Sequence, residues 1–264
     1  MTNAAMSLFD THCHLNFKEF DQDRQQVLDN AQQLGISRML IPAARSEDFE
    51  SIHHLCNIHS GQLYAAYGLH PVFIDSHTEA DIEILRMALN NYPAHAIGET
   101  GLDYYRKDLD RERQKKYLSA QLELACECNL PVILHIRKAH DDVLQLLKRY
   151  PVKGGIAHAY NGSLQQAEKF MQHGFMFGFG GTLTYPNARH IHSLASTLPL
   201  ENLVLETDAP DMTVDSHKGQ RNSPEYLPEC LQALAKLRNL PVEDVARITT
   251  HNACKILSIQ NHAG

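Results

Sequence analysis

The stretch Phe9-Asp10-Thr11-His12-Cys13-His14 decides how the rest of the chain is interpreted. The apolar residues that lead into it predict a buried strand ending in a pair of histidines. Because side chains alternate between the two faces of a strand, His12 and His14 point to one side and Cys13 points into the packing. Two neighbouring imidazoles at a strand end are poor core residues and good ligands for a divalent cation. Two ordinary surface histidines are the alternative, since the chain has 17 histidines.

The composition is that of a folded protein with its own core. The chain has 264 residues, of which 43% are hydrophobic and 21% are charged. This length suits one large or two small domains, and (β/α)₈ barrels commonly occupy about 250 residues. The apolar runs are too short to span a membrane, and the N-terminus lacks the features of a signal peptide. A net charge of −7 argues against bulk coating of nucleic acid but allows a local basic patch.

The cysteines indicate a reducing compartment. Only Cys126 and Cys128 are close in sequence, and a helix would direct them differently. We interpret all six as reduced thiols in or near the core of a cytoplasmic protein.

Apolar strand-length runs alternate with helical patterns along the whole chain. Besides the strand before His12, strands are expected at residues 36–41, 63–68, 94–98, 131–134, 155–157, 175–179 and 203–205. Helices are expected at residues 21–34, 46–59, 79–90, 110–129, 141–150, 163–173, 187–196, 225–237 and 242–257. The alternation predicts a single (β/α)₈ TIM-barrel domain over residues 1–264, with an open doubly wound sheet as the alternative.

Residues that can bind cations recur where these strands end. They are His12, His14, His70, Glu99, His135, His158 and Asp208. Each has an ordinary explanation by itself, as a core histidine, a helix cap or a turn residue. A barrel gathers the C-terminal ends of its strands around one mouth, whereas an open sheet would spread them along an edge. Their recurrence at successive strand ends therefore favours a metal centre and, with it, the barrel.

The ligand types indicate what such a centre would do. Imidazoles and carboxylates are numerous enough for two ions, and Glu99 can bridge them because a carboxylate can bind two cations. Mixed nitrogen and oxygen ligands suit Zn²⁺, Mn²⁺, Fe²⁺, Co²⁺ or Ni²⁺ better than Mg²⁺. Two such ions lower the pKa of a shared water, which predicts a hydrolase.

Several motifs resemble those of the TatD-type metal-dependent hydrolases. They are Asp10-Thr11-His12-Cys13-His14, Gly68-Leu69-His70-Pro71, Gly98-Glu99-Thr100-Gly101-Leu102-Asp103-Tyr104, Pro131-Val132-Ile133-Leu134-His135, Glu206-Thr207-Asp208-Ala209-Pro210, Asn222-Ser223-Pro224 and Thr250-His251-Asn252-Ala253. The resemblance implies an amidohydrolase-like barrel that hydrolyses DNA phosphodiesters, often as a 3′-to-5′ exonuclease. It also implies the metal ligands His12, His14, Glu99, His135, His158 and Asp208.

One segment departs from that family pattern. His158-Ala159-Tyr160-Asn161-Gly162 stands where the family usually has His-Cys-Phe-Ser/Thr-Gly. The ligand and the glycine are kept, so the departure concerns the pocket wall and the substrate preference.

For the reaction, we expect in-line attack of a metal-bridging hydroxide on phosphorus. Asp208 would orient the water and accept its proton, and Glu99 would bridge the two divalent ions. His70 would bind a substrate phosphate or the leaving oxygen. Arg137 and Arg221 would attract an anionic substrate, and Tyr160 could stack on a base; these are the expected substrate contacts.

Other functions remain open at this point. A small-molecule hydrolase acting on a phosphoester, lactone or amide could use the same binuclear site. A non-catalytic binding module would show no metal-dependent turnover. No membrane association and no obligate protein partner are expected, and the absence of known DNA-reading motifs argues against sequence-specific recognition.

Overall fold

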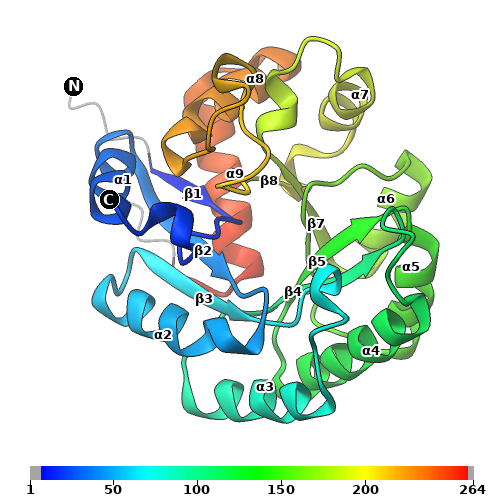
Figure 1. Ribbon diagram of the computed structural model, residues 1–264. Coiled ribbons are helices and arrows are strands. Elements are labelled where there is room, and N and C mark those ends of the chain that lie inside the picture. Colours follow the sequence, from blue (N-terminus) through cyan, green and yellow to red (C-terminus); the bar gives the residue numbers. More distant parts are fainter. Residues whose placement is uncertain (1–6, 261–264) are drawn as a thin grey trace. The chain divides into compact units, whose positions relative to one another are not determined.

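A computed structural model describes residues 7–260, in which parallel strands alternate with helices along the chain (Figure 1). The eight strands form one sheet in the order β1 to β8. A parallel sheet in sequence order, with a helix after every strand, is the (β/α)₈ barrel predicted from the sequence, and this prediction is confirmed. The doubly wound alternative is wrong, because its strand order reverses at a switch point.

The bounds of the elements follow the predicted pattern closely. The strands are β1 Leu8–Asp10, β2 Ile36–Pro42, β3 Leu63–Tyr67, β4 Ala96–Asp103, β5 Val132–Arg137, β6 Gly155–Ala157, β7 Phe175–Phe179 and β8 Leu203–Leu205. The helices are α1 Arg24–Gln33, α2 Phe49–Ile58, α3 Glu79–Asn91, α4 Arg111–Cys128, α5 His140–Arg149, α6 Leu164–Gln172, α7 Arg189–Thr197, α8 Leu227–Arg238 and α9 Val242–Ile256.

The one large difference concerns β4. This strand continues to Asp103, whereas the sequence predicted an end at residue 98. Every residue of β4 is buried, including Glu99 and Asp103. Polar residues and glycine suggested a loop there, but pairing with β5 keeps the backbone extended.

Within the described residues, the chain divides into two compact units, one made of residues 7–41 and 178–260, the other of residues 42–177. The single domain over residues 1–264 therefore stays a prediction. In the first unit, α9 packs against β1, β8 and α8. The side-chain amide of Asn252 on α9 donates to the carbonyls of Leu200 and Leu203, which anchors this helix at the start of β8.

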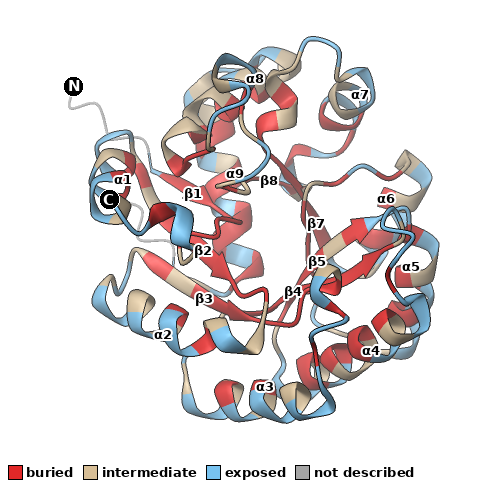
Figure 2. Cartoon of the chain, viewed as in Figure 1, coloured by how far each residue is buried: buried red, intermediate tan, exposed pale blue. Residues whose placement is uncertain are grey.

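In the second unit, paired strands β3 to β6 form a buried layer, and the helices keep exposed outer faces (Figure 2). Helix α4 contributes two buried glutamines to the ends of these strands. Gln121 accepts from the N–H of Leu69 at 2.8 Å and donates to its carbonyl at 3.2 Å. Gln114 makes the same pair of bonds with Asp103, at 2.7 and 3.2 Å. Gln121 thereby fixes the backbone next to His70, and Gln114 fixes the backbone of Asp103 itself.

The described residues hold six free cysteines and no helix with the length and hydrophobicity of a bilayer span. Cys13 is buried as predicted. The prediction that all six thiols lie in or near the core is wrong for Cys128, which is exposed. It is the last residue of α4, where the helix end faces solvent.

Gly101 allows β4 and β5 to approach each other, which gives a testable prediction. It pairs with His135, its φ is +147°, and an added Cβ would lie 1.9 Å from the His135 carbonyl oxygen. Gly101→Ala should lower the free energy of unfolding by roughly 2–5 kcal/mol, through backbone strain plus overpacking.

Gly61→Ala is the matched control for denaturant unfolding. Gly61 also has a positive φ, +86°, but an added Cβ meets nothing within 4 Å. This variant should therefore lose only about 1–2 kcal/mol. Equal losses in the two variants would contradict the steric explanation.

Candidate metal centre

The first unit brings together His12, His14 and Asp208. Their ligand atoms lie within 4.8 Å of one another. The Nε2 atoms of the two histidines are 3.2 Å apart, and both face the Asp208 carboxylate, at 3.6 and 3.7 Å. The prediction that His12 and His14 point to the same side is confirmed. His14 is also held by stacking on Phe17, with ring centroids 4.7 Å apart.

The backbone around this cluster is fixed by a buried carboxylate. Asp10 accepts from the N–H groups of His12 and Thr207 and from the Thr207 hydroxyl. Burial raises the pKa of Asp10 to about 7, although these hydrogen bonds act in the opposite direction. Asp208, the residue after Thr207, has a positive φ of +59°. Its backbone N–H donates to the His12 carbonyl at 2.8 Å. Asp208 is therefore directed at the histidine pair by its own backbone.

The second unit brings together His70, Glu99 and His135. Oε1 of Glu99 lies 3.1 Å from Nε2 of His70 and 3.0 Å from Nδ1 of His135. Glu99 is 1% exposed, so its carboxylate is almost fully removed from water. A buried carboxylate requires charged or hydrogen-bonding partners, and the two imidazoles supply them.

His70 and His135 present different nitrogens to Glu99. Nδ1 of His70 accepts from the Val72 N–H at 3.0 Å, so a neutral ring carries its proton on Nε2. Nε2 of His70 is therefore a donor toward Glu99, not a lone pair for a cation. In His135 it is Nε2 that contacts a carboxylate, Asp103 at 3.0 Å, and Nδ1 that faces Glu99.

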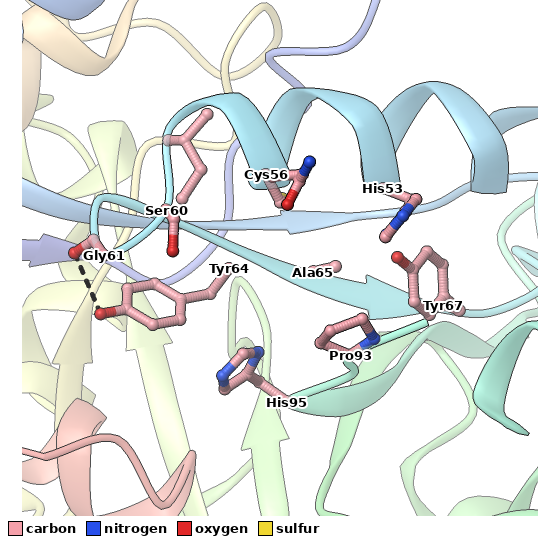
Figure 3. Close-up of a pocket in the computed structure, with 11 residues that line it drawn as sticks. His53, Cys56, Ser60, Gly61, Tyr64, Ala65, Tyr67, Pro93 and His95 are labelled. Atoms are coloured by element: carbon pink, nitrogen blue, oxygen red, sulfur yellow. Dashed lines mark hydrogen bonds between the residues drawn. The ribbon is translucent and has the colours of Figure 1, made fainter. Parts of the chain in front are cut away.

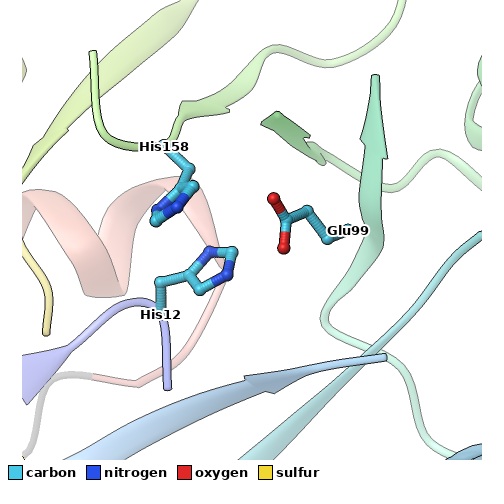
Figure 4. Close-up of side chains that lie close together, drawn as sticks. All are labelled: His12, Glu99 and His158. Atoms are coloured by element: carbon cyan, nitrogen blue, oxygen red, sulfur yellow. The ribbon is translucent and has the colours of Figure 1, made fainter. Parts of the chain in front are cut away.

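His158 follows β6 and is 5% exposed. Its imidazole and the Glu99 carboxylate place ligand atoms within 4.8 Å of each other; Figure 4 draws both side chains, together with His12. The structure thus groups Glu99, His135 and His70, and also places His158 beside Glu99.

The donor set of each unit fits a divalent transition metal. Each cluster combines imidazole nitrogen with carboxylate oxygen at spacings that one ion could span. His12, His14 and Asp208 would hold one ion, and Glu99 and His135 would be ligands of another, with His158 beside Glu99.

The predicted substrate contacts have different surroundings. Arg137 is half-exposed, stacks on Tyr105 with 4.3 Å to the ring centroid, and lies 3.6 Å from Asp103. Arg221 forms a bidentate ion pair with Asp23, at 2.8 and 2.7 Å, so its positive charge is already paired with a carboxylate of the same chain. Tyr160 is 2% exposed and donates to the Ser163 carbonyl, so it packs in the core. Of these three, Arg137 alone lies close to a carboxylate that contacts a cluster residue, since Asp103 faces His135.

Sequence reasoning did not single out Asp10, Asp103, Gln114 and Gln121. A signal for Asp103 was available, because residues 99, 101 and 103 share one face of an extended strand. The two glutamines carried no such signal, since their partners are backbone groups distant in sequence.

A separate pocket of about 200 Å³ lies between α2, β3 and the start of β4 (Figure 3). His53, Cys56, Tyr64, Tyr67 and His95 line it. It contains none of the predicted ligands. Burial lowers the pKa of His95 and raises that of Cys56 to about 12, so these two side chains are neutral near pH 7.

A parallel barrel with two such clusters defines a class, the metal-dependent hydrolases built on (β/α)₈ barrels. The family model described as "TatD related DNase" matches residues 9–258. The chain therefore belongs to the TatD family of metal-dependent hydrolases, and the resemblance drawn from its motifs is confirmed.

Individual relatives agree with this assignment. The chain is 40% identical over 253 residues to the uncharacterized metal-dependent hydrolase YjjV of Escherichia coli K12, covering 95% of this chain and 97% of that protein. The crystal structure of the same E. coli TatD homologue superposes with a TM-score of 0.92, at 39% identity, covering 97% and 100% of the two chains. The 3′-5′ ssDNA/RNA exonuclease TatD of Pantoea sp. is 30% identical over 259 residues, with 96% and 100% coverage.

His70 and His135 present different nitrogens to Glu99, a protonated Nε2 and an Nδ1 lone pair, and this difference predicts different losses of metal. His135→Ala removes a lone pair and should remove or strongly weaken one bound ion. His70→Ala removes a hydrogen-bond donor and should leave the number of bound ions unchanged. The measurement is metal content of both purified variants after loading with Zn²⁺ and desalting. Loss of an ion from the His70 variant would contradict the tautomer assigned to His70.

Proposed function

We propose that the protein is a deoxyribonuclease that hydrolyses phosphodiester bonds of DNA from the 3′ end, using two divalent metal ions. The observation that carries the proposal is the pair of imidazole–carboxylate clusters, one of which adjoins a histidine N–H donor. Support for the substrate comes from the "TatD related DNase" family description and from the printed name of the Pantoea relative.

When bound, the cations lower the pKa of a water and neutralise charge that develops on the phosphoryl oxygens. The residues of the chain do the remaining work. Asp208 orients the attacking water and accepts its proton, because its carboxylate faces the histidine pair and keeps 16% of its side chain exposed. Burial of Glu99 and of the histidines keeps their side chains in place.

His70 binds an oxygen of the substrate phosphate or of the leaving group. Its Nε2–H is held in place because the Val72 N–H fixes Nδ1 and Gln121 fixes the preceding residue. A donor aimed at developing negative charge stabilises the transition state more than the ground state.

Arg137 and Tyr105 provide the surface that contacts the DNA strand in which the scissile bond lies. Tyr105 is 59% exposed, and its ring is covered on one side by the Arg137 guanidinium. An exposed aromatic ring beside an arginine suits one base and one phosphate of single-stranded nucleic acid.

A substrate panel tests the proposal. Metal-loaded protein should progressively shorten a 5′-labelled single-stranded DNA oligonucleotide, and EDTA treatment should abolish cleavage until Mn²⁺ or Zn²⁺ is restored. Cleavage should weaken steeply as salt rises, because phosphate contacts release counterions. Turnover of simple phosphate esters, lactones or amides but not of DNA would show that the protein is a small-molecule hydrolase instead of a nuclease. No turnover on any substrate would indicate a binding module.

Asp208→Asn tests the proposed base. The substitution keeps the shape of the side chain but removes proton acceptance, so kcat should fall by about 10²–10⁴-fold with an unchanged unfolding midpoint. Asp215→Asn is the matched control, since Asp215 is an exposed aspartate in the same unit. Near-full activity of the Asp208 variant would refute the role.

A further inference from the structure

We propose that Asp103 is a positioning residue that makes His135 a metal ligand by fixing the proton of His135 on Nε2. The inference rests on the proposed metal centre and adds a residue to it. It starts from the fact that a neutral imidazole has one N–H and one lone pair, and that the partner of one nitrogen decides the role of the other.

The side chain of Asp103 is oriented to accept hydrogen bonds. It is 0% exposed, and its Oδ1 accepts from the N–H groups of Tyr105 and Arg106, at 3.0 and 3.1 Å. Its Oδ2 faces Nε2 of His135 at 3.0 Å and Nη1 of Arg137 at 3.6 Å. All of these neighbours are donors or can donate, so the carboxylate directs the Nε2 proton of His135 toward itself.

The backbone of Asp103 is fixed as firmly as its side chain. Gln114 on α4 bonds both the N–H and the carbonyl of Asp103. Asp103 also lies opposite Arg137, two residues beyond His135, in the β4–β5 register. The carboxylate therefore meets the imidazole edge through strand pairing.

The consequence for His135 is a lone pair on Nδ1, the nitrogen that faces Glu99 at 3.0 Å. His70 also carries its proton on Nε2, because a backbone N–H occupies its Nδ1, but it is this Nε2–H that faces Glu99. Two histidines beside one carboxylate are thus assigned to different tasks by their partners, one to bind a cation and the other to donate a hydrogen bond.

Asp103→Asn tests the inference with almost no change in volume. If the amide oxygen stays with the two backbone N–H groups, the amide NH₂ faces His135 and reverses its tautomer. If the amide turns over, its NH₂ opposes those backbone donors. Either arrangement weakens the ion at His135, and second-sphere substitutions of this kind cost about 10–100-fold in metal affinity.

Titration of Zn²⁺ into the chelator-stripped full chain measures this loss. The wild-type chain should bind two ions, and the D103N variant should bind one normally and one about 10–100-fold more weakly. Asp142→Asn is the matched control, because Asp142 pairs with Tyr104 and Lys115. It should bind Zn²⁺ like the wild type. Equal affinity in D103N and wild type would overturn the inference, whereas a wild-type chain that binds no Zn²⁺ would overturn the proposed function itself.

A second measurement does not depend on the folding of the variant. Long-range ¹⁵N–¹H NMR of the Zn²⁺-loaded wild-type protein should show the His135 proton on Nε2, with Nδ1 bound to zinc. A His135 ring bound through Nε2 and protonated on Nδ1 would refute the role of Asp103.

Discussion

Burying imidazoles and carboxylates is unfavourable unless each nitrogen and oxygen finds a partner, and this requirement governs the neighbourhood of both clusters. Glu99 and Asp103 both belong to β4, both contact His135 and have almost no exposed surface. Their partners are two imidazoles, backbone N–H groups and one guanidinium. The apolar strands around them exclude water, which strengthens every one of these interactions.

The need of each buried polar atom for a partner also gives two histidines different chemical roles. His70 and His135 approach the same oxygen of Glu99, but the ring nitrogens that face away from Glu99 have different partners. Nδ1 of His70 contacts a backbone N–H donor, and Nε2 of His135 contacts a carboxylate acceptor. Identity as histidine therefore does not determine function at this site. The partner on the far side of the ring does, and that partner comes from a turn in one case and from the neighbouring strand in the other.

The positions of most strands and of several site residues could be predicted from the sequence, because they depend on short local patterns. Apolar runs located the strands, and polar residues at their ends located His12, Glu99 and Asp208. The extension of β4 could not be predicted, since Glu99-Thr100-Gly101 resembles a loop and only pairing with β5 keeps it extended. Tyr160 was expected at a substrate surface because it follows His158, but aromatic neighbours such as Phe177 enclose it in the core. Arg221 likewise looked available until its pairing with Asp23 was seen.

Gln114 and Gln121 give α4 an influence beyond its packing. The two amides lie seven residues apart on one helix. They bond the backbone at the end of β4, where Asp103 lies, and the backbone after β3, where Leu69 precedes His70. A small axial slide of α4 would shift both at once, and misplacement by about 1 Å can cost 10²-fold in rate. The outer surface of α4, remote from any ligand atom, is thereby mechanically connected to the proton donor and to the carboxylate behind His135.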